Sequence, residues 1–165
     1  MFYEDVFREL DRRRVRYVVV RGVALVLHGV VRLTADLDLM VQLERANLVA
    51  FVEAMEALGY RPRVPVPASE FVESENRRRW RVEKGMAVFS FYHPTDHGKL
   101  IDVFVDEPIA FLEVDQAKTV IKAADLSIPI ISVPHLKQLK RISGRPQDLA
   151  DIEALEAIER IGGSS

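Results

Sequence analysis

The chain has 165 residues, no cysteine, and 25 acidic against 23 basic side chains, for a net charge of -2 at pH 7. This near-neutral charge excludes a nucleic-acid binder that relies on a global positive field, and the absence of cysteine excludes disulfides, thiolate metal sites and cysteine catalysis. At this length we expect one domain over residues 1–165, with a core that needs no covalent or metal staple.

Hydrophobic periodicity and turn residues predict a mixed α/β (α+β) chain. The predicted elements, in chain order, are a helix over 2–14, a strand over 17–20, a short helix ending at Gly29, a strand over 36–41, a helix over 44–58, a proline-rich extended loop over 62–67, strands over 86–92 and 100–105 joined as an antiparallel hairpin, an extended segment over 127–133, and helices over 134–143 and 146–161.

The chain shows no signal peptide and no segment that would span a membrane. Its first five residues are partly acidic, and the apolar run near Val18 is interrupted by Arg21 and His28. That run is too short to cross a bilayer. We therefore expect a cytoplasmic protein with no membrane contact.

Two carboxylates close the apolar segment over residues 31–41. Its polar side chains, Arg32, Thr34, Asp36 and Asp38, all fall on even positions. Alternate side chains of a strand point to opposite faces, so these four are expected to share one face.

A third carboxylate, Asp102, lies among β-branched and aromatic residues over 100–105. Three unpaired carboxylates brought together would repel, and a divalent metal is the natural compensation, since magnesium is held by carboxylates together with substrate phosphates. The alternative is that Asp36, Asp38 and Asp102 are separate surface carboxylates.

Upstream of the aspartate pair, the sequence over 17–29 indicates a buried strand, a turn at Gly22 and a short helix. Amide groups at the start of a helix point outward and its dipole favours anions, so this pattern predicts a phosphate site.

These residues carry a resemblance to a known family. The sequence resembles the nucleotidyltransferase superfamily of the DNA polymerase β type, in particular the minimal members that include abortive-infection toxins and antitoxin nucleotidyltransferases. Gly22 matches the glycine turn, Asp36 and Asp38 match the Asp-x-Asp pair, and Asp102 matches the third aspartate. A second match covers the tail over 133–140 and 144–152, which resembles the helical segment that closes the site in such proteins.

The resemblance implies a nucleotidyltransferase fold, with a mixed central sheet flanked by helices and a helical closing segment over about 134–161. It implies two Mg²⁺ ions held by Asp36, Asp38 and Asp102, and a nucleoside triphosphate (NTP) as substrate. Asp102 would also accept the proton of the attacking hydroxyl. Metal charge and alignment would supply the larger share of catalysis.

One position departs from the family pattern. Arg21 stands where the family has the first glycine of its pair. A bulky side chain there would crowd the loop that approaches the triphosphate, unless it points away or donates to phosphate. The substitution bears on activity more than on fold.

Four further residues are candidates for nucleotide binding. Arg32 and Thr34 share the carboxylate face, where Arg32 would reach phosphate or pair with an aspartate. Lys140 matches the tail lysine of the family and would meet the β- and γ-phosphates. Lys137 lies one helical turn earlier, where a solvated helix face is the alternative.

A basic run over residues 76–81 surrounds the only tryptophan and is a candidate acceptor-binding site. Arg78 and Arg79 would contact phosphates while Trp80 stacks on a base. The alternative is a charged strand or loop face, which is the usual role of such a run.

By resemblance, the acceptor hydroxyl belongs to RNA, a protein side chain or a small molecule, and toxin or antitoxin duty is implied by the minimal members. The rival interpretation is a nucleotide-binding or partner-binding module on the same fold that has lost catalysis, for which Arg21 is the main argument. The oligomeric state is not predicted.

Overall fold

The computed structural model of this chain describes residues 3–31 and 34–163. Within these residues, the elements in chain order are α1 (Glu4–Arg12), β1 (Tyr17–Val20), α2 (Arg21–Leu27), β2 (Asp36–Val41), α3 (Arg45–Ala57), β3 (Arg61–Pro62), the 3-10 helix η1 (Ala68–Val72), α4 (Ser74–Lys84), β4 (Val88–Tyr92), β5 (Leu100–Phe104), α5 (Phe111–Ala117), β6 (Thr119–Ala123), β7 (Leu126–Ile130), α6 (Val133–Ser143) and α7 (Pro146–Gly163).

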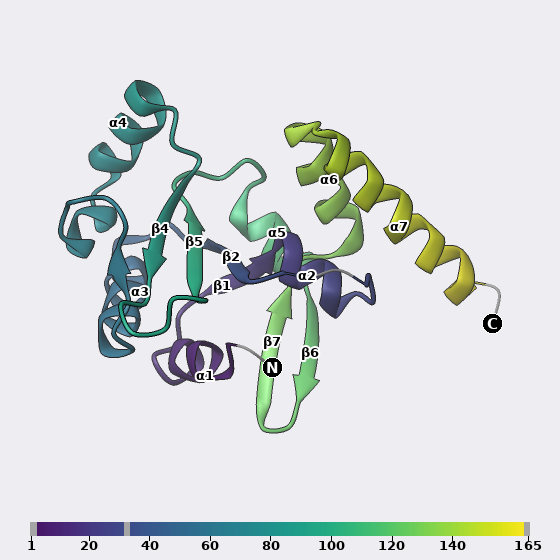
Figure 1. Cartoon of the computed structure of the whole chain (residues 1–165), viewed down its shortest axis with the longest axis horizontal. Helices are drawn as coiled ribbons and strands as arrows, with labels where there is room; N and C mark the ends of the chain where they lie inside the picture. Colours follow the sequence, from purple (N-terminus) through teal and green to yellow (C-terminus); the bar gives the residue numbers. More distant parts are fainter. Residues whose placement is uncertain (1–2, 32–33, 164–165) are drawn as a thin grey trace.

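The described strands form one mixed sheet of seven, in the order β3-β4-β5-β2-β1-β7-β6. β2 pairs with β5 in parallel and with β1 in antiparallel orientation, while β4 and β5 form an antiparallel hairpin. The α/β (α+β) fold class predicted from the sequence is therefore confirmed, with helices on either side of a mixed sheet (Figure 1).

The two faces of the central strands have different chemistry because side chains alternate along each strand. On one face Leu37, Leu39, Ile101 and Val103 are fully buried. Phe89 and Phe91 continue this face on β4 and meet rings of α3, η1 and α4, namely Phe51, Phe71 and Trp80. The other face carries Asp38, Asp102 and Ser90 in paired positions.

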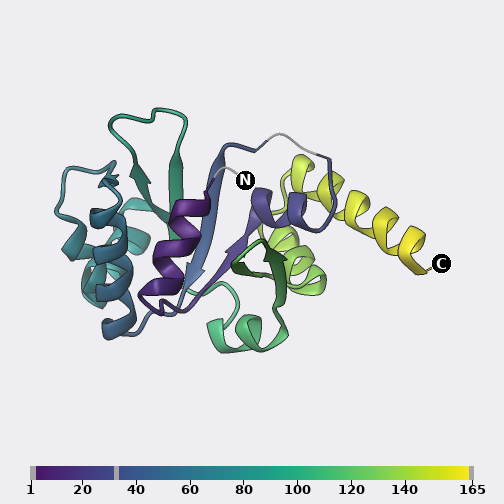
Figure 2. The ribbon, with the colours of Figure 1, turned by 90° about the horizontal axis from the view of Figure 1, so that it is seen from below.

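Two pairs of helices lie toward opposite ends of the sheet (Figure 1). α3 and α4 lie near β4 and β5, whereas α6 and α7 pack on each other at the other end, and α7 extends away from the sheet (Figure 1; Figure 2). The closing helices predicted from the tail are thus present, as α6 and α7. Among the described residues, we find no helix with both the length and the apolar character needed to cross a membrane.

Several elements differ from the sequence expectation, among them the short strand β3 and the 3-10 helix η1, which were not predicted. The run over 76–81 is part of the helix α4, because one side of it buries Arg77 and Trp80, and Gly85 ends it in a left-handed conformation with φ of 63°. The sequence also did not predict α5 or β6. β6 is an edge strand with mostly exposed side chains, so it shows little of the hydrophobic alternation by which strands are identified.

Candidate active site

Asp36, Asp38 and Asp102 are brought to one cavity by the pairing of β2 with β5. In this parallel register Asp36 pairs with Leu100 and Asp38 pairs with Asp102, so the latter two side chains point to the same face. The cavity has a volume of about 320 Å³. Its lining residues are Arg21, Gly22, Thr34, Ala35, Asp36, Asp38, Asp102, Lys140, Arg145 and Asp148.

Burial and neighbouring negative charges raise the pKa values of two of the carboxylates, Asp38 and Asp36. Asp38 is only 7 % exposed, and its pKa is raised to about 7 by burial and by the charges of Asp102 and Asp36, against the opposing effect of Arg21. Burial and the charge of Asp102 likewise raise the pKa of Asp36, while Arg63 opposes that rise. The site therefore resists ionisation unless a positive charge joins it.

The carboxylates fit a divalent cation by their chemistry, since hard cations take carboxylate oxygens as ligands. The crowding that raises the pKa values of Asp36 and Asp38 is what such a cation would relieve. As they stand, however, the described residues contain no group of three or more His, Cys, Asp or Glu side chains arranged to hold a metal ion. The two-ion magnesium site expected from the resemblance thus stays a prediction.

Asp102 is oriented by the neighbouring strand. Ser90 on β4 pairs with Asp102 on β5, and its hydroxyl donates a short hydrogen bond to Asp102 Oδ1. This bond holds the carboxyl group by one oxygen, so that Oδ2 is left for a ligand.

The turn between β1 and α2 uses Arg21 rather than Gly22. The prediction that Gly22 makes the turn is wrong, because the left-handed residue is Arg21, with φ of 60°. Gly22 is needed for close approach instead: a Cβ there would lie 2.5 Å from Thr34 Oγ1. The Thr34 hydroxyl in turn donates a hydrogen bond to the Asp36 carbonyl at 3.4 Å.

The Arg21 side chain points into the site. Its guanidinium carbon lies 4.8 Å from the centroid of the Phe104 ring, and its Nη1 lies 3.8 Å from Asp38 Oδ1. Of the alternatives left open for Arg21, pointing away from the site is therefore excluded, because an aromatic face and a carboxylate both attract its cation. α2, which begins at this residue, has seven residues.

Lys140 lies in the cavity wall, but two aspartates of α7 share its charge. Its Nζ is 3.0 Å from Asp151 Oδ2 and 3.7 Å from Asp148 Oδ1, and the side chain is 5 % exposed. Asp148 also accepts a hydrogen bond from Arg145 Nε at 2.8 Å. Burial alone would raise the pKa of Asp148, but hydrogen bonds from Arg145 and Ser143 lower it to about 2.

Two of the expected nucleotide-binding residues are not placed at this cavity by the structure. Lys137 turns toward α7, where its Nζ lies 2.9 Å from Glu159 and 3.7 Å from Glu156. It therefore links the two closing helices. Arg32 lies outside the described residues.

The candidate acceptor site on α4 is also corrected. Trp80 is 3 % exposed and stacks on Phe89 at 5.0 Å, so its ring is not available to a base. Arg78 pairs with Glu75 at 2.5 Å on the same helix. Phe89 lies on the sheet face opposite Asp102, so α4, which packs on Phe89, lies away from the carboxylates. Arg79 belongs to the same helix and is therefore also away from them.

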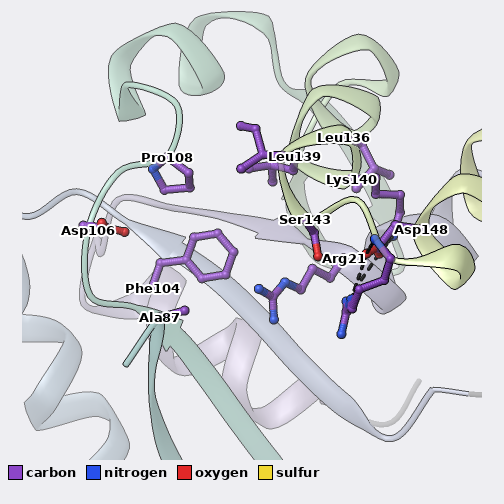
Figure 3. A pocket seen from close by; sticks show the side chains of 12 residues that line it. Arg21, Ala87, Phe104, Asp106, Pro108, Leu136, Leu139, Lys140, Ser143 and Asp148 are labelled. Atoms are coloured by element: carbon purple, nitrogen blue, oxygen red, sulfur yellow. Dashed lines mark hydrogen bonds and ion pairs between the residues drawn. The ribbon is translucent and has the colours of Figure 1, made fainter. Parts of the chain in front are cut away.

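Sequence reasoning missed a second cavity beside the carboxylates. It has a volume of about 250 Å³ and lies between Phe104, at the end of β5, and Leu136 and Leu139 of α6 (Figure 3). Phe104 is two residues beyond Asp102, so strand alternation was the available signal for it. Arg145 and Asp148 line both cavities and were not among the residues that the sequence indicated for the site.

No family model matches the sequence, and no curated protein matches it. Solved structures do match. The lincosamide antibiotic adenylyltransferase LnuA, in a lincomycin-bound crystal structure, has a TM-score of 0.55 at 19% identity, covering 90% of this chain and 90% of that chain. The antibiotic-resistance factor ANT(2'')-Ia has a TM-score of 0.55 at 15% identity, covering 99% of this chain and 90% of that one.

A third structure, of a nucleotidyltransferase from Thermotoga maritima whose assignment is itself provisional, has a TM-score of 0.53 at 14% identity, covering 97% of this chain and 89% of that one. Identities this low carry the fold and not the activity. The chain thus has the nucleotidyltransferase fold that the resemblance predicted.

Proposed function

We propose that this chain, which has the nucleotidyltransferase fold, transfers a nucleoside monophosphate from an NTP to a hydroxyl acceptor with release of pyrophosphate. The observation that carries the proposal is the pairing of Asp38 with Asp102 on adjacent strands, in a cavity that also contains Asp36. Such a cluster of carboxylates, with Arg21 and Lys140 in the lining of the same cavity, suits a metal-bound phosphate chain.

Each part of the cavity has a separate task in this reaction. The acceptor oxygen forms a bond to the α-phosphorus, and the bond from that phosphorus to the bridging oxygen of the leaving pyrophosphate breaks. Asp102 takes the proton of the hydroxyl at Oδ2, since Ser90 already occupies Oδ1. Arg21 and Lys140, at the wall, offer positive charge to the phosphates.

Magnesium ions held by Asp36, Asp38 and Asp102 would supply the positive charge that aligns the phosphates and stabilises the leaving pyrophosphate. The crowded carboxylates support this assignment, because Asp38 ionises with difficulty in the free protein. Gly22 and Thr34 line the same wall, where their close approach fixes the backbone beside the phosphates.

We further propose a small molecule as acceptor. Two matched structures hold such molecules: LnuA is bound to lincomycin, and a crystal structure of ANT(2'')-Ia is in complex with adenylyl-2''-tobramycin. The burial of Trp80 removes the stacking residue on which the RNA-contact interpretation of residues 76–81 depended.

The test is incubation of the protein with each labelled NTP, magnesium and a panel of hydroxyl-bearing small molecules, followed by measurement of labelled product and pyrophosphate. Transfer that is abolished in Asp36→Ala and Asp38→Ala supports the proposal. The matched control is Asp125→Ala, an exposed carboxylate in the turn before β7, which should leave transfer unchanged. Transfer that survives in Asp38→Ala would contradict it.

One observation favours a second candidate, a nucleotide-binding module without transfer. Arg21 holds a left-handed conformation at the family's glycine position and lies 3.8 Å from Asp38, where it competes with a cation. Magnesium-dependent nucleotide binding measured by calorimetry, without label transfer to any acceptor in the panel, would select this candidate.

A further inference from the structure

Arg21 stands at the junction of the two cavities. It lines both the carboxylate cavity and the apolar cavity, and its side chain extends toward the Phe104 ring, with Lys140 and Asp148 on its other side (Figure 3). Its guanidinium carbon lies 4.8 Å from the ring centroid, within the range of a cation–π contact. Phe104 itself is 5 % exposed and therefore fixed in place by its surroundings.

The contact between Arg21 and Asp38 is loose by comparison. Nη1 and Oδ1 are 3.8 Å apart, whereas hydrogen-bonded arginine–carboxylate pairs lie at about 2.7–2.9 Å and are often two-pronged. The Arg21 side chain is 37 % exposed, so it is not fixed in place by packing on all sides. The ring and the carboxylate thus compete for one guanidinium.

We propose that Phe104 is a positioning residue that acts through Arg21. Its ring holds the guanidinium at the junction and keeps it from closing a two-pronged pair with Asp38, so that the Asp38 oxygens stay available to a cation and the guanidinium edge faces the phosphates. The part concerning phosphates rests on the proposed function. The competition between Phe104 and Asp38 for Arg21 exists in the ligand-free protein and is tested there first.

The first experiment measures the coupling between Arg21 and Asp38 by urea unfolding of Arg21→Gln, Asp38→Asn and the double variant, without divalent cations. The cycle is repeated with Phe104→Leu as background. When the ring is removed, we expect the coupling between Arg21 and Asp38, expressed as a ratio of unfolding equilibrium constants, to increase about 2- to 30-fold. This is the range that a cation–π contact covers. An equal or weaker coupling would overturn the proposal.

The second experiment uses calorimetry to measure the affinity of the protein for the α,β-methylene analogue of each of the four nucleoside triphosphates, with magnesium present. Phe104→Leu should weaken binding about 2- to 30-fold, and Phe104→Tyr, which keeps a ring, should bind as the wild type does. In an Arg21→Gln background, Phe104→Leu should have no further effect. Unchanged affinity in Phe104→Leu, or the same loss without Arg21, would overturn the proposal.

Two controls separate positioning from general loosening of the core. Phe89→Leu makes the same substitution on the opposite sheet face, where the ring stacks on Trp80, and should leave the Arg21–Asp38 coupling unchanged. A change as large as that of Phe104→Leu would overturn the proposal. Phe104→Met repeats the cycle if the leucine variant does not fold.

If the wild type binds none of the four nucleotides while the coupling strengthens as expected, the proposed function fails. The conclusion that Phe104 positions Arg21 is then still supported. The two conclusions are therefore distinguished by the same set of proteins.

Discussion

Asp38 and Asp102 occupy paired positions on adjacent parallel strands, with Ser90 beside them on the next strand. Two carboxylates held on one face at neighbouring positions repel each other, and burial strengthens that repulsion. The strand pairing that gathers the site therefore also destabilises the ligand-free protein, and this cost is measurable.

Asp38→Asn should stabilise the protein above neutral pH when divalent cations are removed. Asp38 has its pKa raised from 3.8 to about 7, so the folded protein holds the proton more tightly than the unfolded chain, and stability falls as pH rises through that window. The asparagine variant lacks this loss and should gain at most about 4 kcal/mol above pH 7. Urea unfolding between pH 4 and 8 measures the difference.

Near pH 4 the two proteins should have similar stability, which provides an internal control. Asp125→Asn, at an exposed position, should not change the pH dependence in this direction. Parallel stability curves for Asp38→Asn and the wild type would contradict the raised pKa of Asp38.

Gly22→Ala should destabilise the protein by about 1–3 kcal/mol, because the added methyl group would meet Thr34 Oγ1 at 2.5 Å in a buried turn. Thermal or urea unfolding measures the loss. Thr34→Ala in the same chain should recover part of it by removing that oxygen. Gly162→Ala is the matched control, since a Cβ there meets nothing within 4 Å. Equal effects at the two glycines would argue against the close approach.

Lys140→Met and Lys137→Met make the same change three residues apart on α6, with different expected results. Removing Lys140 leaves Asp148 and Asp151 without their shared buried cation and should cost about 3 kcal/mol of unfolding free energy. Lys137 pairs with partly exposed glutamates, so its loss should cost about 1 kcal/mol or less. Urea unfolding compares them, and a larger loss at Lys137 would reverse the assignment.

Trp80→Phe should lower stability while leaving nucleotide affinity unchanged. The ring is buried against Phe89 on the sheet face opposite Asp102, so its role is in packing. We expect a loss of about 1 kcal/mol in urea unfolding. Calorimetric titration with magnesium and a nucleotide analogue checks the second half, and a selective loss of nucleotide affinity would restore a binding role for this helix.

Much of the site could be predicted because strand alternation is a local property. Asp36 and Asp38 fall on one face by spacing alone, and the hairpin that carries Asp102 follows from its turn and its apolar strands. The meeting of the two strands is a long-range event, and only the family resemblance anticipated it. Local sequence also does not show which residue of a turn has the left-handed conformation. The turn was therefore predicted at Gly22, whereas the left-handed residue is Arg21.

The misjudged α4 has a related cause. A run of arginines has no apolar periodicity. The burial of Trp80 and Arg77 depends on contacts with other elements, which the sequence of the helix itself does not reveal. Arg77, for example, donates to the carbonyl oxygens of Phe71 and Val72, which no propensity scale records.

The insertion of α3, β3, η1, α4 and β4 between β2 and β5 has a consequence for assembly of the protein. Asp38 and Asp102 become neighbours only when β2 pairs with β5 across this whole stretch of sequence, and pairing across such a separation is among the slower steps of folding. An incompletely folded chain would therefore lack the carboxylate cavity, and under the proposed function nucleotide capture would report that the centre of the sheet has formed.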